Sequence, residues 1–180
     1  MKWLIASDIH GSAKYCKEML KAFEREGADR LILLGDLLYH GPRNDLPEEY
    51  APKEVIAMLN AVKEDVFCVR GNCEAEVDQA VLEFPVMADY ALLDVGKKTV
   101  FITHGHVYNA KNMPPLKEGD VLLHGHTHIP ACEDIGGILY CNPGSVALPK
   151  GDCKRGYMTL DGNILCWKDL EGIVQRTYTL

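Results

Sequence analysis

The chain contains 180 residues, of which 47% are hydrophobic, and its 19 basic and 26 acidic side chains give a formal net charge of -7. This length and hydrophobic content predict one domain, residues 1–180, whose core needs neither disulfides nor a structural metal. The acidic balance, without any strongly basic stretch, excludes a nonspecific nucleic-acid or anionic-lipid surface, and no apolar run is long enough to span a membrane.

The cysteine pattern indicates the cellular compartment. The seven cysteines are an odd number, and no two of them form a Cys-x-x-Cys pair. This usage is typical of a reducing compartment and does not favour a thiolate zinc site. Asp8 lies where a secretory signal peptide would need an apolar core. We therefore expect a cytoplasmic protein.

Strand–helix units are expected in the first half of the chain. Short apolar runs that indicate buried strands occupy residues 3–7, 31–34 and 66–69. A helix is expected between Ser12, a capping residue, and Gly27, and another at residues 52–62 with Pro52 in its first turn. Successive units of this kind favour parallel strands in an α/β sheet.

The second half of the chain predicts strands separated by turns. Residues 90–95 and 99–103 flank a Gly-Lys-Lys turn and indicate a hairpin. Further short strands are expected at residues 121–123, 131–135, 138–141, 156–160, 164–167 and 173–178. Two β-sheets packed face to face, with helices outside, would accommodate all of these elements.

Residues 37–51 form a loop with proline and glycine that is longer than ordinary connections between a strand and a helix. Long loops of this kind inside compact domains are usually functional or mobile. His40 and Arg43 in the loop are candidates to bind substrate phosphate, since the planar guanidinium group matches phosphate geometry. The alternative is a solvated surface insertion.

Side chains that commonly bind metals follow the ends of the predicted strands. They are Asp8, His10, Asp36, Asn72, His104, His126 and His128. Ligand sites in α/β sheets gather outside the carboxyl ends of the strands, so we expect these loops to converge. Carboxylates, imidazoles and an amide oxygen suit Mn²⁺, Fe²⁺, Zn²⁺ or Ni²⁺. The sequence therefore predicts a divalent metal site.

The other polar residues near these ligands are expected to have structural roles. His106 and His124 are expected to support the ligands or to pack in the core. Residues 142–145, Asn-Pro-Gly-Ser, are expected to form a turn that shapes the wall of the site. Glu74 and Glu76 are expected to begin a helix, where acidic side chains favour the positive end of the helix dipole.

The order of the motifs Asp-x-His, Gly-Asp, Gly-Asn, His-x-His and Gly-His-Thr-His resembles the calcineurin-like metallophosphoesterase superfamily. The segments HGPRN, VRGNC, EVDQ, THGH and NPGS are further similar to the bacterial YfcE-type phosphodiesterases. The resemblance implies a four-layer αββα sandwich, with two packed mixed β-sheets flanked by helices. It also implies two divalent metal ions in a dinuclear site, with Mn²⁺ expected and Zn²⁺, Fe²⁺ or Ni²⁺ as alternatives.

The resemblance also assigns roles to the ligands by position. The residues assigned to the first ion are Asp8, His10, Asp36 and His128. Those assigned to the second ion are Asn72, His104, His126 and again Asp36, which would bridge the two ions. A hydroxide between the ions is then expected to attack the phosphorus of a phosphodiester in line. The residues expected to take part in the reaction are Asp36, Asn72, His104 and Cys73.

Cys73 departs from the wider superfamily, in which many members carry at this position a histidine that protonates the leaving group. A thiol of ordinary pKa is a poor general acid for an alkoxide at neutral pH. We therefore expect small diesters with good leaving groups to be hydrolysed better than monoesters.

Two other functions remain open from the sequence. One is a phosphomonoesterase or nucleotidase that uses the same site, and the other is a non-catalytic protein-binding scaffold, as in the small retromer subunit. The complete set of ligands favours catalysis. A homodimer is compatible with the sequence, although no feature requires it.

Overall fold

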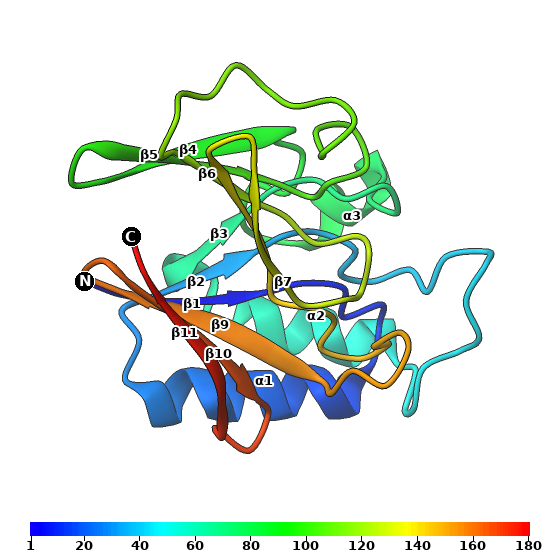
Figure 1. Cartoon of the computed structure of the whole chain (residues 1–180). Coiled ribbons are helices and arrows are strands. Elements are labelled where there is room, and N and C mark those ends of the chain that lie inside the picture. Colours follow the sequence, from blue (N-terminus) through cyan, green and yellow to red (C-terminus); the bar gives the residue numbers. More distant parts are fainter.

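The computed structural model describes residues 1–180, and strands alternate with helices in the first half of the chain (Figure 1). In chain order these elements are β1 (Lys2–Ala6), α1 (Ala13–Glu26), β2 (Arg30–Leu33), α2 (Pro52–Asn60), a 3-10 turn (Lys63–Asp65), β3 (Val66–Cys68) and α3 (Glu76–Val81). The second half contains only strands, which are β4 (Tyr90–Val95), β5 (Lys98–Thr103), β6 (Val121–Leu123), β7 (Ala131–Ile135), β8 (Ile138–Asn142), β9 (Gly156–Asp161), β10 (Ile164–Asp169) and β11 (Val174–Thr179). All the strands expected from the sequence are present, with small differences at their ends.

The strands form two mixed sheets that pack face to face. The first sheet has the order β11-β10-β9-β1-β2-β3 and the second has the order β4-β5-β6-β8-β7. In the first sheet β1 pairs parallel with β2 and antiparallel with β9. In the second sheet β5 pairs antiparallel with β4 and parallel with β6. The predicted α/β class with two packed mixed sheets is therefore confirmed.

Helix α1 begins and ends where the sequence predicts. The Ser12 hydroxyl accepts a hydrogen bond from the backbone N–H of Tyr15 at 3.3 Å. Gly27 ends the helix in the left-handed conformation, with φ of 56°, which glycine adopts without the strain of a side chain. Pro52 occupies the first turn of α2, where its missing N–H removes no helical hydrogen bond.

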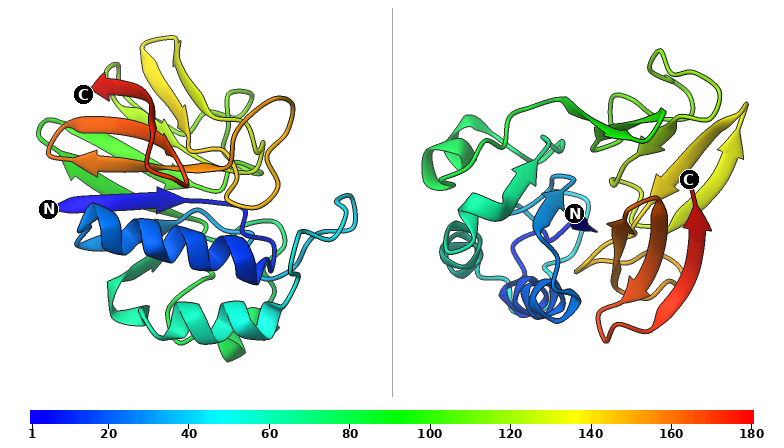
Figure 2. Two further views of the ribbon diagram at one scale, coloured as in Figure 1. Left: turned by 90° about the horizontal axis from the view of Figure 1, so that it is seen from below. Right: turned by 90° about the vertical axis from the view of Figure 1, so that its left-hand side faces the viewer.

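Alternate side chains of the first sheet belong to two different hydrophobic cores, because successive side chains of a strand point to opposite faces of the sheet. Leu4 and Ala6 of β1 pack against the helices. Ile5 points to the other face and packs against Ile102 and Leu123 of the second sheet. Figure 2 shows α1 and α2 side by side on the outer side of the first sheet. The strands that lead into the site are thus held from both faces.

The outer face of the second sheet is covered without a helix. The segment 105–119 contains no helix or strand, and its Tyr108 packs on Phe101 of β5. Pro114 and Pro115 disfavour a helix here because proline lacks the backbone N–H that a helix needs. The resemblance implies helices outside both sheets. The structure has helices outside the first sheet and this loop outside the second (Figure 1).

The seven cysteines form no disulfide. Burial raises the pKa of the Cys16 thiol to about 12, so this side chain behaves as a small apolar residue of the core. None of the helices combines the length and the apolar character that crossing a membrane would require.

Glu26, the last residue of α1, ties this helix to the first sheet. Its carboxylate lies 2.8 Å from the ammonium groups of Lys2 and Lys168 and accepts a hydrogen bond from the Tyr157 hydroxyl at 2.7 Å. Burial opposes the charge, but these three partners outweigh it and lower the pKa of Glu26 to about 2.

We expect Glu26→Gln to lower the free energy of unfolding at pH 7 by about 2 kcal/mol. Because the pKa of Glu26 is depressed in the folded state, this stabilisation is complete above the ordinary value of 4.5 and is lost as the pH falls toward 2. Urea unfolding of both proteins between pH 7 and pH 3 would measure the difference. Glu18→Gln, at an exposed pair with Lys21, is the control, with an expected change below about 0.5 kcal/mol. A difference that does not shrink with falling pH would contradict this role of Glu26.

Candidate metal centre

The predicted ligands come together at the carboxyl ends of strands from both sheets. Asp8 and His10 follow β1, Asp36 follows β2, Asn72 follows β3, His104 follows β5, and His126 and His128 follow β6. Because the two sheets pack face to face, their loops meet over one edge of the sandwich. The convergence of loops expected from the sequence is therefore present.

Most of these ligands have an unusual backbone conformation. The positive φ angles are 60° at Asp8, 50° at His10, 56° at Asp36, 65° at His126 and 62° at His128. Outside the site, Glu49 is the one other residue with a side chain that has positive φ. Such conformations cost on the order of 1–3 kcal/mol each and persist only where surrounding contacts hold them, as at functional sites.

One group of ligand atoms surrounds the carboxylate of Asp8. His128 Nε2 lies 3.2 Å from Asp8 Oδ1 and 3.2 Å from His10 Nε2. His10 Nε2 in turn lies 3.6 Å from Asp8 Oδ1 and 3.7 Å from Asp36 Oδ2. Two imidazole nitrogens this close repel each other through their lone pairs unless a proton or a cation lies between them. This group therefore suits a shared cation.

A second group of ligand atoms includes the same oxygen of Asp36. His104 Nε2 lies 3.5 Å from Asp36 Oδ2, 3.2 Å from Asn72 Oδ1 and 3.3 Å from His126 Nδ1. Asp36 Oδ2 is thus within 3.7 Å of a histidine nitrogen in each group. A carboxylate in this position is available to two cations at once.

Backbone carbonyl groups fix the orientation of three of the histidines. The Nδ1 atoms donate to these carbonyl oxygens: His10 to Tyr39 at 2.8 Å, His104 to Leu34 at 2.6 Å and His128 to Leu148 at 2.6 Å. Since each carbonyl accepts, Nδ1 carries a proton, and Nε2, which is directed toward the carboxylates, is the atom that can bind a cation. Histidines that bind metals are held in this way.

The donor atoms fit the divalent ions that the sequence predicts. Asp8 Oδ1 is buried and accepts no hydrogen bond, which is costly for a carboxylate unless a cation is bound. Three triads of side chains have all their ligand atoms within 4.8 Å of one another, and these are Asp8, His10 and His128; Asp8, Asp36 and His104; and His10, Asp36 and Cys73. Such oxygen and nitrogen donors suit hard or borderline divalent ions.

The protein keeps the carboxylates of the site ionised. Burial disfavours the charge of Asp8, but the neighbouring histidines His10, His128 and His104 outweigh it and hold the pKa of Asp8 well below its ordinary value. Burial likewise opposes the charge of His104, but the hydrogen bond to Asp36 and the charge of Asp8 raise the pKa of His104 to about 9. The negative potential of the carboxylates therefore attracts positive charge to this point.

Glu74 has a role that the sequence did not predict. It lies before α3, which begins at Glu76, so the expected helix start at Glu74 was wrong. Its buried carboxylate accepts hydrogen bonds from the backbone N–H groups of Gly71 at 2.5 Å, Asp36 at 2.8 Å and Leu37 at 2.7 Å. Burial and the nearby charge of Asp36 raise the pKa of Glu74. Glu74 thereby joins the loop after β2 to the loop after β3.

Glycine is required where two backbones approach the ligands closely. A Cβ atom at Gly71 would lie 2.1 Å from Asp36 Oδ1, and one at Gly125 would lie 2.0 Å from Ser7 Oγ and 2.9 Å from Asp8 Oδ2. Neither space admits a methyl group, so these glycines allow the carboxylates to sit against the neighbouring loops.

The other polar residues near the ligands pack beside them or contact their loops. His124 is buried and packs on Tyr140, with ring centroids 4.0 Å apart, and the His106 ring lies 5.4 Å from that of His104. In the 142–145 turn, the Ser145 hydroxyl donates to the Asp8 carbonyl oxygen at 2.8 Å. This turn therefore holds one of the ligand loops.

A polar cavity of about 160 Å³ opens beside the ligands and extends from Asn72, Cys73 and His128 to Arg43 and Lys150. Arg43, which the sequence suggests as a substrate contact, lines this cavity, and so does Lys150, which was not singled out from the sequence. A larger apolar cavity of about 380 Å³, next to β3 and β4, contains none of the predicted ligands.

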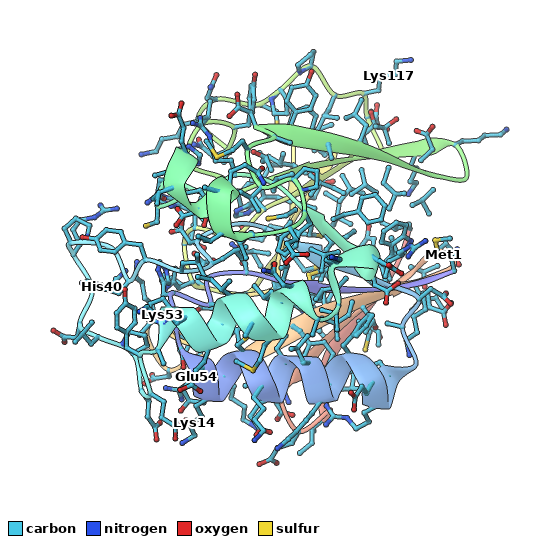
Figure 3. All side chains as sticks on the ribbon, turned by 180° about the vertical axis from the view of Figure 1, so that it is seen from behind. Met1, Lys14, His40, Lys53, Glu54 and Lys117 are labelled. Atoms are coloured by element: carbon cyan, nitrogen blue, oxygen red, sulfur yellow. The ribbon has the colours of Figure 1, made fainter.

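His40 does not line the polar cavity. Its ring packs between Tyr39 and Tyr50, with centroid distances of 4.7 and 5.3 Å. Its carbonyl oxygen accepts a hydrogen bond from the Asn44 side chain at 2.8 Å. Figure 3 shows His40 on the loop that leaves the body of the molecule. The structure therefore gives His40 a part in packing the loop and no direct contact with the cavity.

The sequence matches a family model described as the calcineurin-like phosphoesterase superfamily domain over residues 1–163. The chain belongs to this superfamily. It is 48% identical over 165 residues to the phosphodiesterase YfcE of Escherichia coli K12, covering 92% of this chain and 90% of that protein. It is 30% identical over 167 residues to the probable metallophosphoesterase YsnB of Bacillus subtilis 168, covering 89% and 83% of the two chains.

A solved structure supports the same assignment. The structure of YfcE, a phosphoesterase from E. coli, is similar to this chain with a TM-score of 0.95 and 44% sequence identity over 99% of both chains. As a metallophosphoesterase of the calcineurin-like superfamily, the chain is expected to act with divalent metal ions, and the converging carboxylates and imidazoles are the candidates to bind them.

Cys73 is the residue at which this metallophosphoesterase lacks the histidine of many superfamily members. Its backbone N–H donates to Asp36 Oδ1 at 2.9 Å, and the Asn72 amide nitrogen lies 3.3 Å from its sulfur. Burial and the charge of Asp36 raise the pKa of the Cys73 thiol above its ordinary value. The thiol is therefore neutral at pH 7 and is a poor nucleophile and a poor proton donor.

Proposed function

We propose that this chain is a phosphodiesterase with a dinuclear metal site. The observation that carries the proposal is the position of Asp36 Oδ2 within 3.7 Å of a histidine nitrogen in each group of ligand atoms. The proposed ligands of the first ion are Asp8, His10, Asp36 and His128. Those of the second ion are Asp36, Asn72, His104 and His126.

When bound, two divalent ions would supply positive charge to the phosphoryl oxygens and lower the pKa of the water that attacks phosphorus. We propose Mn²⁺ because of the family resemblance, and the same oxygen and nitrogen donors accept Zn²⁺, Fe²⁺ or Ni²⁺.

The residues of the chain hold the ions and orient the substrate. Asp36 shares its charge between both groups of ligands, and the carbonyl of Leu34 keeps His104 Nε2 free to bind a cation. Asn72 directs its oxygen toward His104 and its amide nitrogen toward the sulfur of Cys73. It therefore stands where it can also contact a substrate oxygen in the cavity.

The raised pKa of Cys73 accounts for the proposed preference for diesters. A neutral thiol whose pKa lies above its ordinary value gives up its proton reluctantly, so the leaving group has to depart as an anion. Diesters with good leaving groups satisfy this condition, whereas alkyl monoesters do not. The identity of 48% to a protein named phosphodiesterase supports the same substrate class.

Hydrolysis of bis(4-nitrophenyl) phosphate and 4-nitrophenyl phosphate by chelated protein, with single metals added back, tests the proposal. We expect metal-dependent turnover that is at least about tenfold higher for the diester. Higher monoester turnover would assign a phosphomonoesterase to the same site. An absence of turnover with any ion, although metal is bound, would exclude the enzyme and favour a protein-binding scaffold.

We further propose that the protein acts in the cytoplasm on a small substrate. The seven free cysteines suit a reducing compartment, and a cavity of about 160 Å³ suits a small phosphodiester. A homodimer is compatible with this function, and light scattering in solution would determine the oligomeric state.

A further inference from the structure

Two cationic side chains line the polar cavity beside the metal ligands. Arg43 comes from the long loop after β2, and Lys150 comes from the loop between β8 and β9. Both are exposed and form no ion pair. By contrast, Arg70 and Lys154 pair with Asp89 and Asp169. Arg43 and Lys150 therefore have their positive charge available to a molecule in the cavity.

The backbone holds Lys150 next to the ligand His128. The Lys150 N–H donates to the His128 carbonyl oxygen at 3.3 Å, and the Leu148 carbonyl accepts the hydrogen bond from His128 Nδ1 at 2.6 Å. The segment 148–150 is thus bonded to this ligand in two places. The backbone from which the Lys150 side chain extends is therefore held next to the metal centre.

The loop that carries Arg43 is anchored to the site on both sides. Before Arg43, the carbonyl of Tyr39 accepts the hydrogen bond from the ligand His10 at 2.8 Å. After it, the Ala51 N–H donates to the Gly11 carbonyl oxygen at 2.8 Å. Figure 3 shows this loop leaving the body of the molecule at His40. Arg43 lies between these two anchors and is one of the residues that line the cavity.

The lining of the cavity does not suit an apolar group. Only one of its ten lining residues is hydrophobic, so a neutral aryl or alkyl substituent would find few partners there. Under the proposed function, the oxygens of the reacting phosphodiester would be bound by the metal ions. The two unpaired cations that also line this polar cavity are therefore available to bind a second anion.

We propose that Arg43 and Lys150 form a second anion subsite, which binds a carboxylate or phosphate carried by a substituent of the substrate. The inference rests on the proposed phosphodiesterase function and specifies its substrates. Small diesters with a further anionic group are bound in preference to diesters whose substituents are neutral.

Binding of three matched phosphonates to the metal-loaded protein tests the subsite by calorimetry. The probes are phenylphosphonate, 4-carboxyphenylphosphonate and benzene-1,4-diphosphonate. The first carries no second anionic group, the second carries a carboxylate, and the third carries a second phosphonate as an analogue of phosphate. We expect one or both of the probes that carry a second anionic group to bind about tenfold more tightly than phenylphosphonate, because each of the two exposed ion pairs contributes about threefold in affinity.

Arg43→Gln and Lys150→Met are each expected to reduce this preference to about threefold, and the double variant is expected to remove it. Lys117→Met is the matched control, because Lys117 is also exposed and unpaired but lies on the outer loop, far from His40 (Figure 3). The control should keep the full preference. Equal affinity of the wild-type protein for all three probes, or a preference that survives in the double variant, would overturn the subsite.

A kinetic comparison separates this inference from the proposed function. 4-Nitrophenyl 4-carboxyphenyl phosphate and 4-nitrophenyl phenyl phosphate share a leaving group and differ by one carboxylate. A lower KM for the carboxylated diester, lost in the double variant, would support the subsite. If neither diester is hydrolysed with any metal, the proposed function fails, while the phosphonate affinities still decide whether the subsite exists.

Discussion

Replacing Asp36 by asparagine is expected to lower phosphodiester turnover by at least about a thousandfold. The Oδ2 atom of Asp36 lies 3.7 Å from His10 Nε2 and 3.5 Å from His104 Nε2, so one atom serves both groups of ligands. Asparagine can still accept the hydrogen bond that Cys73 N–H gives to Asp36 Oδ1. It is neutral, however, so both groups lose the anion that they share.

The kcat/KM for bis(4-nitrophenyl) phosphate, together with the metal content per chain, measures this effect. Asp161→Asn is the matched control, since Asp161 is an exposed aspartate at the end of β9 and its variant should match the wild type in both quantities. Thermal unfolding would verify that Asp36→Asn is folded. Turnover above about a tenth of the wild-type value, with full metal content, would contradict a bridging role for Asp36.

Much of the fold is predictable because its elements carry strong local signals. Ser12 and Gly27 delimit α1 through a side-chain cap and a left-handed residue, and Pro52 marks the first turn of α2. The buried strands are apolar runs that end at polar residues. The outer layer of the second sheet was less predictable, since the covering of Phe101 by the loop 105–119 depends on tertiary packing.

The candidate ligands are predictable because each follows a strand, and the carboxyl ends of strands in an α/β fold meet at one edge. The geometry of the ligands is less predictable from the sequence. The left-handed backbone of Asp36 accompanies the close approach of Gly71, a residue distant in sequence. Likewise, Arg43 and Lys150 reach one cavity from separate loops, and no local pattern connects them.

Glu74 shows how a long-range contact overrides a local preference. An acidic residue shortly before α3 suits the positive end of a helix dipole, and Glu76 in the first turn has this environment. Glu74 instead turns inward to the N–H groups of Asp36 and Leu37. The sequence signal that remains is its position directly after the Gly-Asn-Cys segment, which does not specify its partners.

Glu74→Gln is expected to lower the free energy of unfolding of the metal-free protein by about 1–2 kcal/mol at pH 7, because the lost hydrogen bonds outweigh the relief of charge repulsion with Asp36. Oε2 of Glu74 accepts two backbone N–H groups, from Gly71 and Asp36, and Oε1 accepts a third, from Leu37. A glutamine offers one oxygen, so its amide group must face at least one of these buried donors. Urea unfolding in the presence of a chelator measures the loss.

Glu76→Gln is the control for Glu74→Gln, because Glu76 is an exposed acid two residues away at the start of α3, and its replacement should change stability by no more than about 0.5 kcal/mol. Since Glu74 joins the loop of Asp36 to that of Gly71, its variant should also bind metal at least about tenfold more weakly. Equal stability of the two variants would show that the three N–H groups find other acceptors. Unchanged metal affinity in a destabilised Glu74→Gln protein would show that Glu74 stabilises the fold without positioning Asp36.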